Sequence, residues 1–212
     1  MTYQEYADRQ IANARKHFNK HVAYFVDLKG EHPLQILDWR MASGEIWYSV
    51  RYLFDPAGGT VTISGDLGWA VVVPTWRADF ASTASIGVNP HYFMEQVRAT
   101  SDSYDYDREE VKKELTDKFK ELREEWSEEK KDDWWRDLDE DVGNVMSCFD
   151  RAKGFKFDDA LAMDTLNQYD DRYWEWLYSL GRHYSTRVWL WLVGLQMAKE
   201  QLDEADKAKH GE

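Results

Sequence analysis

The chain has 212 residues and a formal net charge of −13, and 43% of its residues are hydrophobic and 15% aromatic. This length suits one domain with a sizeable core, and the aromatic content excludes an intrinsically disordered chain. The acidic balance excludes nonspecific binding to nucleic acid and to anionic membranes, because like charges repel.

The cysteine count and the apolar runs indicate where the protein acts. Cys148 is the single cysteine, so no disulfide forms within the chain, and a reducing compartment is expected. The N-terminal residues show no secretory signal. The longest apolar run, residues 188–195, is far shorter than the ~20 residues of a membrane span. We therefore expect a cytoplasmic protein that does not enter a membrane.

The first half of the chain changes from helical to alternating patterning. Thr2 and Glu5 form a capping-box pattern at the start of a helix that we expect over residues 3–25. Asn89 and Pro90 predict the start of a second helix, which extends to about residue 100. Between the two helices, short turns rich in glycine predict an antiparallel meander. Its strands are expected at residues 36–41, 45–54, 60–64 and 69–74.

From Asp107 onward the spacing of apolar residues predicts only helices. The first follows the stripe through Val111 and Phe119, and a helix near residues 135–149 either continues it or stands apart. Two more are expected, at residues 158–180 and from Ser185 or Thr186 onward. The expected fold class is α+β: a small antiparallel β-meander with an N-terminal helix and a larger C-terminal helical part. Residues 1–100 form the helix-plus-meander region and residues 101–212 the acidic helical region, packed as one domain.

No motif predicts a catalytic residue, a metal site or a cofactor. His17 and His21 have a metal-ligand spacing on the expected helix, but no third ligand is near them in sequence. Cys148 is interpreted as a buried helical cysteine. Residues 65–68 lack the lysine and hydroxyl residue of a phosphate loop, so we interpret them as a β-turn.

A carboxylate-based hydrolase is the main alternative to a binding protein. Such an enzyme needs carboxylates that converge in a cleft, often beside aromatic residues. The expected β region contains carboxylates and tryptophans of this kind: Asp38, Glu45, Asp55, Asp66, Trp39, Trp47, Trp69 and Trp76.

The acidic excess is concentrated in one segment. Residues 102–141 contain 18 acidic and nine basic residues, so they supply −9 of the −13 charge. Some of these charges form ordinary i,i+4 helix pairs, and the others form either a solvated face or an acidic binding face. Tryptophan is enriched in binding hot spots, so a tryptophan among acids suits a basic partner surface. The predicted partner-binding residues are Glu121, Glu124, Glu125, Glu128, Asp132, Asp133, Trp134 and Trp135.

Residues 48–55 and 63–70 of the meander resemble a pattern found in small accessory proteins of phages and prophages. The resemblance implies an inhibitor of host defence, such as an anti-CRISPR protein, and it implies no catalytic residue. We therefore expect a protein without enzymatic activity in the host cytoplasm. Its expected partner is a basic host protein or a ribonucleoprotein complex such as a CRISPR effector, with no direct contact to nucleic acid. A phage assembly or structural protein is a further alternative.

Overall fold

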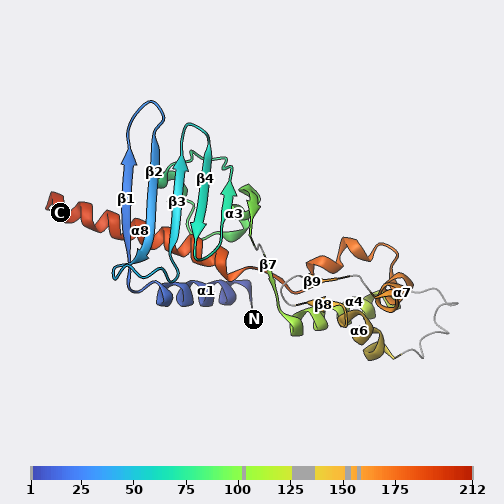
Figure 1. Cartoon of the computed structure of the whole chain (residues 1–212). Coiled ribbons are helices and arrows are strands. Elements are labelled where there is room, and N and C mark those ends of the chain that lie inside the picture. The colour runs from blue at the N-terminus through green and yellow to red at the C-terminus, as the bar shows by residue number, and fades with distance from the viewer. Residues whose placement is uncertain (1, 102–103, 126–136, 151–153, 157–158, 212) are drawn as a thin grey trace. The chain divides into compact units, whose positions relative to one another are not determined.

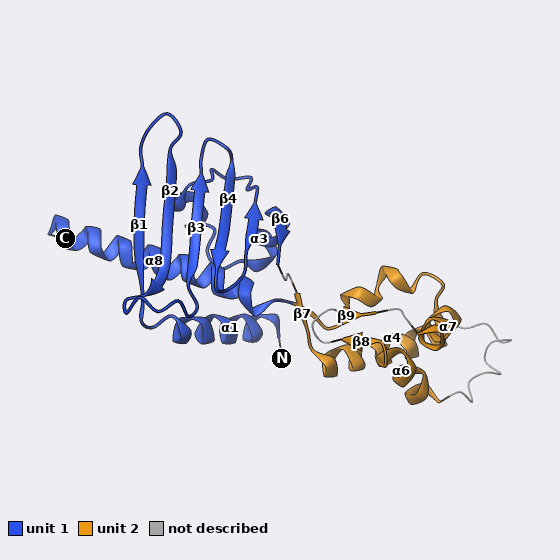
Figure 2. Cartoon of the chain, in the orientation of Figure 1, with its two compact units in different colours: residues 1–103, 184–212 blue, residues 104–183 orange. Residues whose placement is uncertain are grey.

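The computed structural model describes residues 2–101, 104–125, 137–150, 154–156 and 159–211, and it divides into two compact units (Figures 1 and 2). Unit 1 comprises residues 1–103 and 184–212, and unit 2 comprises residues 104–183. The sequence grouped residues 184–212 with the acidic helical region, whereas the structure places them in unit 1. The reason is the apolar segment of the last helix, which is needed to cover the sheet of unit 1.

Unit 1 is a six-stranded antiparallel sheet with helices on one face (Figure 1). The strands follow the chain in the order β1 to β6 across the sheet. They are β1 (His21–Leu28), β2 (Leu34–Met41), β3 (Val50–Asp55), β4 (Thr60–Gly65), β5 (Ala70–Val72) and β6 (Val97–Thr100). The helices are α1 (Tyr3–His17), α2 (Phe80–Ala84), α3 (Pro90–Gln96) and α8 (Thr186–His210).

Helix α8 completes the core of unit 1. Its central residues are buried on all sides, and Trp191 packs in the same cluster as Trp39 and Tyr52 of the sheet. The Tyr52 hydroxyl donates a hydrogen bond of 2.6 Å to the backbone carbonyl of Trp191. Towards its C-terminal end, Gln201 accepts a hydrogen bond from the Ala23 backbone N–H at 3.2 Å and donates one to the His21 carbonyl at 2.9 Å. The amide of Gln201 thereby satisfies one backbone donor and one backbone acceptor of the edge strand β1.

Unit 2 is mainly helical and has a core of its own. Its elements are β7 (Tyr104–Tyr106), α4 (Arg108–Glu124), α6 (Leu138–Met146), β8 (Phe149–Asp150), β9 (Gly154–Phe155), α7 (Ala160–Tyr169), two 3-10 turns (Tyr173–Glu175 and Leu177–Ser179) and β10 (Arg182–Tyr184). β10 pairs with β7, and β8 pairs with β9. The core includes Val111, Leu115 and Phe119 of α4, Val142 of α6 and Leu166 of α7.

The predicted α+β class is confirmed, as are the capping box at Thr2 and the helix starts at Asn89 and Ser185. The helix expected over residues 3–25 is wrong in its second half. It ends at His17, and β1 follows, because the β-branched and aromatic residues there favour a strand that pairs along its whole length with β2.

The expectation that the chain from Asp107 onward contains only helices is also wrong in detail. The structure contains the short strands β8, β9 and β10 in this part of the chain. Gly154, the first residue of β9, has a φ of 73°, which glycine adopts without strain. Phe149 and Phe155 then pack edge to face at 5.4 Å, so burial of these rings stabilises the short pair. Ahead of Asp107, the second expected helix ends at Gln96, and the residues after it form β6.

None of the helices in the described ranges combines the length and the apolar character that crossing a membrane requires.

Candidate functional site

The structure places three of the predicted partner-binding residues at the C-terminal end of α4. Glu121, Glu124 and C-cap residue Glu125 are all exposed there. Glu121 is bound by Lys118 at 3.0 Å, and we find no ion pair of Glu124 or Glu125 with any described residue. The other predicted residues lie outside the described residues: Glu128, Asp132, Asp133, Trp134 and Trp135.

A buried polar network holds this end of α4 against its neighbours. Arg123 donates to the Asp141 carboxylate of α6 at 2.9 Å and to the Tyr169 hydroxyl of α7 at 2.7 Å. That hydroxyl in turn donates to Asp141 at 2.7 Å, and the Tyr169 ring stacks on Phe119 at 3.8 Å. Burial, together with the Asp141 carboxylate, raises the pKa of Tyr169, so the hydroxyl remains a donor. The three helices therefore form a fixed base for the side chains around them.

The same network brings a second set of acids close to the first. Asp141 belongs to the first turn of α6, so its bond to Arg123 places that turn beside the end of α4. We call the exposed carboxylates at this junction the acidic corner: Glu121, Glu124, Glu125, Asp137, Asp139 and Glu140.

Helix stability explains only part of the acidic corner. The acids at the start of α6 complement the positive end of the helix dipole, and Asp137 also caps the helix by accepting from the Asp139 N–H at 2.9 Å. Glu124 and Glu125 instead lie at the negative end of α4, where an exposed carboxylate costs roughly 0.3–1 kcal/mol. Arg123 is the one basic residue of that last turn, and it is buried and bonded to Asp141. Within the described residues, neither the helix dipole nor an ion pair therefore accounts for Glu124 and Glu125.

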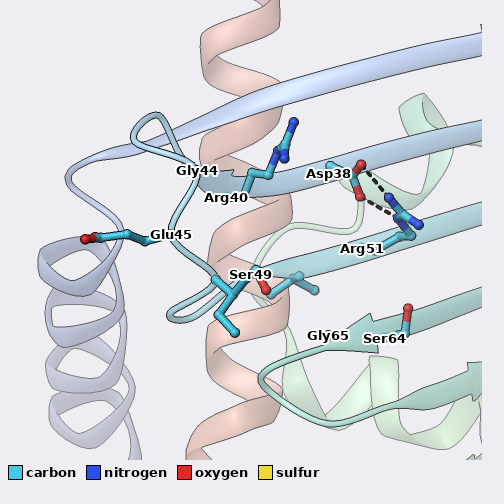
Figure 3. A pocket seen from close by; sticks show the side chains of 10 residues that line it. Asp38, Arg40, Gly44, Glu45, Ser49, Arg51, Ser64 and Gly65 are labelled. Carbon is cyan, nitrogen blue, oxygen red and sulfur yellow. Dashed lines mark hydrogen bonds and ion pairs between the residues drawn. The ribbon is translucent and has the colours of Figure 1, made fainter.

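A second candidate site is a pocket of about 260 Å³ on the face of the sheet that the helices of unit 1 leave open (Figure 3). Figure 3 shows Asp38, Arg40 and Arg51 on this open side, with α8 behind the strands. Arg51 closes on Asp38 with two hydrogen bonds, of 2.6 and 2.8 Å. The hydroxyls of Ser49 and Ser64 complete the polar part of the lining.

The carboxylates named for a hydrolase do not converge in this pocket. The hydrogen bond from Arg51 lowers the pKa of Asp38, so this carboxylate stays ionised and is a poor proton donor. Figure 3 shows Glu45 pointing away from Asp38. Asp55 accepts from the Gly58 N–H at 2.7 Å within its turn, and Asp66 accepts from the Tyr48 N–H at 2.9 Å. Each of these two aspartates holds a turn or loop of the sheet.

The loop between β2 and β3 is fixed although it is exposed. Tyr48 has a φ of 58°, which is uncommon for a residue other than glycine. Its N–H is held by Asp66, and its ring stacks on His17 at 4.9 Å. Ile46 and Trp47, which precede it, are 71% and 63% exposed. The loop therefore presents two large apolar side chains to solvent next to the pocket.

The histidine pair and the cysteine lie on different elements from those expected. His17 ends α1 and His21 begins β1, so the two are not on one helix. Over the described ranges we find no group of three or more His, Cys, Asp or Glu side chains suited to a metal ion. Cys148 is buried, as expected, but it follows α6 and is not part of that helix.

His21 is expected to make the stability of unit 1 depend on pH. Its side chain is buried beside Phe18 and Trp39, and this burial lowers its pKa below the ordinary value of 6.5, although the backbone of Tyr48 and Trp47 opposes part of the shift. Below about pH 6.5 the unfolded chain therefore binds a proton that the folded chain refuses. The free energy of unfolding should fall with decreasing pH, by up to about 1.4 kcal/mol per pH unit.

Urea titrations at several pH values between 5 and 8 measure this dependence. The His21→Phe variant should show a shallower fall than the parent protein over that range. The matched variant His32→Gln, which removes an exposed histidine, should keep the parent slope. Identical slopes for all three proteins would show that His21 titrates normally in the folded state.

Comparison of the chain with protein-family models, with curated proteins and with solved structures finds no match.

Proposed function

We propose that the protein is a non-enzymatic binding protein, an inhibitor of a bacterial defence system of the anti-CRISPR kind. The acidic corner binds a basic surface that handles nucleic acid on a host protein or ribonucleoprotein. The observation that carries the proposal is the position of Glu124 and Glu125 at the negative end of α4. There they oppose the helix dipole and have no cation among the described residues.

The rigid base under the acidic corner supports this function. Arg123 fixes α4 to Asp141 and Tyr169, so the carboxylates around it are held by packed helices. Preorganised charges lose less entropy on binding than charges on a mobile segment. To a basic groove on a partner, the carboxylates of the acidic corner resemble the phosphates of a nucleic acid. Their long-range electric field steers the encounter with such a groove.

Charge reversal tests the acidic corner directly. The triple variant Glu121→Lys, Glu124→Lys and Glu125→Lys should bind a CRISPR effector complex at least about tenfold more weakly than the parent protein, because it now repels the basic surface. The matched control Asp203→Lys, Glu204→Lys and Asp206→Lys changes the net charge equally on the exposed end of α8. This control should keep the parent affinity.

Two measurements read the outcome. Biolayer interferometry against a panel of purified effector complexes gives the rates, and added salt should slow association more than it speeds dissociation. Plating of phage on a host with active CRISPR immunity gives the biological effect, which the triple variant should lose. Equal affinity of the triple variant and the control, in folded proteins, would overturn the role of the acidic corner. Failure to bind any effector would overturn the proposed partner.

A further inference from the structure

The open face of the sheet in unit 1 has a defined order of polar and apolar rows. The strand register aligns Tyr24, Asp38, Arg51 and Ser64 across β1 to β4. On the same face, a mostly apolar row crosses the whole sheet two positions away from this polar row. It consists of Val26, Ile36, Leu53, Thr62, Val71 and Ala99.

This face is not covered by the helices of unit 1. Those helices pack on the opposite side, where Leu37, Trp39 and Tyr52 are buried. On the open side Tyr24 is 42% and Val26 49% exposed. A face of this kind, with apolar side chains beside a polar pocket, is typical of a site that contacts another molecule.

Arg40 is the side chain that indicates what the pocket binds. It lines the pocket, and its guanidinium lies over the ring of Tyr24 at 4.4 Å. Acids outnumber bases by 40 to 27 in this chain, yet no carboxylate among the described residues forms an ion pair with Arg40. Arg51, its neighbour in the pocket, is already closed on Asp38. The stack on Tyr24 holds one guanidinium in place with its donors available.

The charges of the pocket select a single carboxylate over a polyanion. Arg51 is paired with Asp38, and Glu45 points away from Asp38 (Figure 3), so Arg40 is the cation of the lining that has no ion pair among the described residues. One carboxylate is matched by Arg40, whereas successive phosphates of a nucleic acid would meet Asp38, Glu45 and a chain of net charge −13. Guanidinium also suits the planar, two-oxygen geometry of a carboxylate.

We propose that this pocket and the apolar row beside it form a binding site for an acidic peptide segment. The segment carries one Asp or Glu side chain on Arg40 and apolar side chains on Val26, Ile36 and Leu53. Ser49 and Ser64 donate further hydrogen bonds to the carboxylate or to the peptide backbone. The site lies in unit 1 and does not involve the acidic corner, so it goes beyond the function proposed above.

Nuclear magnetic resonance of the full, ¹⁵N-labelled chain tests the site with defined probes. A blocked peptide with one glutamate between valines should give saturable shifts at the amides of Ser49 and Ser64 and at Nε of Arg40. Its glutamine counterpart should give none. Arg40→Gln should weaken binding roughly tenfold or more, because it removes a charge-assisted pair. Arg9→Gln is the matched control, since Arg9 also stacks on a tyrosine, Tyr6, but on α1.

Several results would overturn the proposal. Equal binding of the glutamine peptide, or equal loss in Arg9→Gln, would remove the role of Arg40. Acetate that binds as tightly as the peptide would show a site for small carboxylates only, and a short single-stranded DNA that shifts the same signals would show a phosphate site. The charge-reversed variant of the acidic corner should keep parent affinity for the glutamate peptide. Failure at either site is thus distinguishable from failure at the other.

Discussion

Replacing Arg123 by alanine is expected to lower the free energy of unfolding of unit 2 by about 3–5 kcal/mol. Asp141 is only 2% exposed, and the substitution leaves its carboxylate buried without the guanidinium that balances it. The Tyr169 hydroxyl loses a donor at the same time. Urea unfolding, followed by hydrogen exchange in α4, α6 and α7, measures the loss.

Two further variants separate the buried charge from general effects on α4. Lys120→Ala removes an exposed base of the same helix, 3.9 Å from Asp117, and should change stability by only about 0.5 kcal/mol. The double variant Arg123→Met with Asp141→Leu replaces the pair by apolar side chains and should be more stable than Arg123→Ala. If Arg123→Ala and Lys120→Ala are equally stable, the network does not hold unit 2 together.

The second large effect is expected in unit 1. Trp191→Ala should lower the free energy of unfolding of that unit by about 3–5 kcal/mol, because the indole is 1% exposed and lies at the centre of the core between α8 and the sheet. The two units have separate cores with no residue in common. Hydrogen exchange should therefore accelerate in β2, β3 and β4, while α4 and α7 keep their protection.

An exposed tryptophan of the same unit provides the control. Trp47 is 63% exposed, so Trp47→Ala removes the same atoms without opening a cavity and should leave exchange in the sheet unchanged. Accelerated exchange of both units in Trp191→Ala would mean that the chain unfolds as one cooperative body.

Local sequence signals predicted the parts of the fold that local chemistry determines. Caps and turns act through neighbouring residues, and the helix starts at Thr2, Asn89 and Ser185 are therefore correct. The first strand was missed because Val22 and Phe25 also continue the helical stripe of the residues before them. Pairing with β2, which runs from Leu28↔Leu34 to His21↔Met41 and so reaches beyond the local window of a helical pattern, determines the outcome.

The candidate sites depend on long-range pairing in the same way. The sequence located an acidic excess but not the bond between Arg123 and Asp141 that joins two helix ends into one corner. It named Asp38 as a hydrolase carboxylate because the register with Arg51 was unknown. Tyr24 could not be placed under Arg40 while residues 21–25 were assigned to a helix. An arginine and a tyrosine at diagonal positions of two paired strands predict a contact only once the pairing of the strands is known.

The order of the units along the chain has a consequence for synthesis. Unit 2 is inserted between β6 and α8, and α8 supplies the helix that buries the inner face of the sheet. A ribosome releases all six strands and then the whole of unit 2 before it releases α8. During that interval, Leu37, Trp39 and Tyr52 lack their partner helix, whereas unit 2 already possesses every residue of its own core. Unit 2, although translated later than the sheet, is thus able to finish folding first. A chaperone would engage this chain while the sheet still lacks α8.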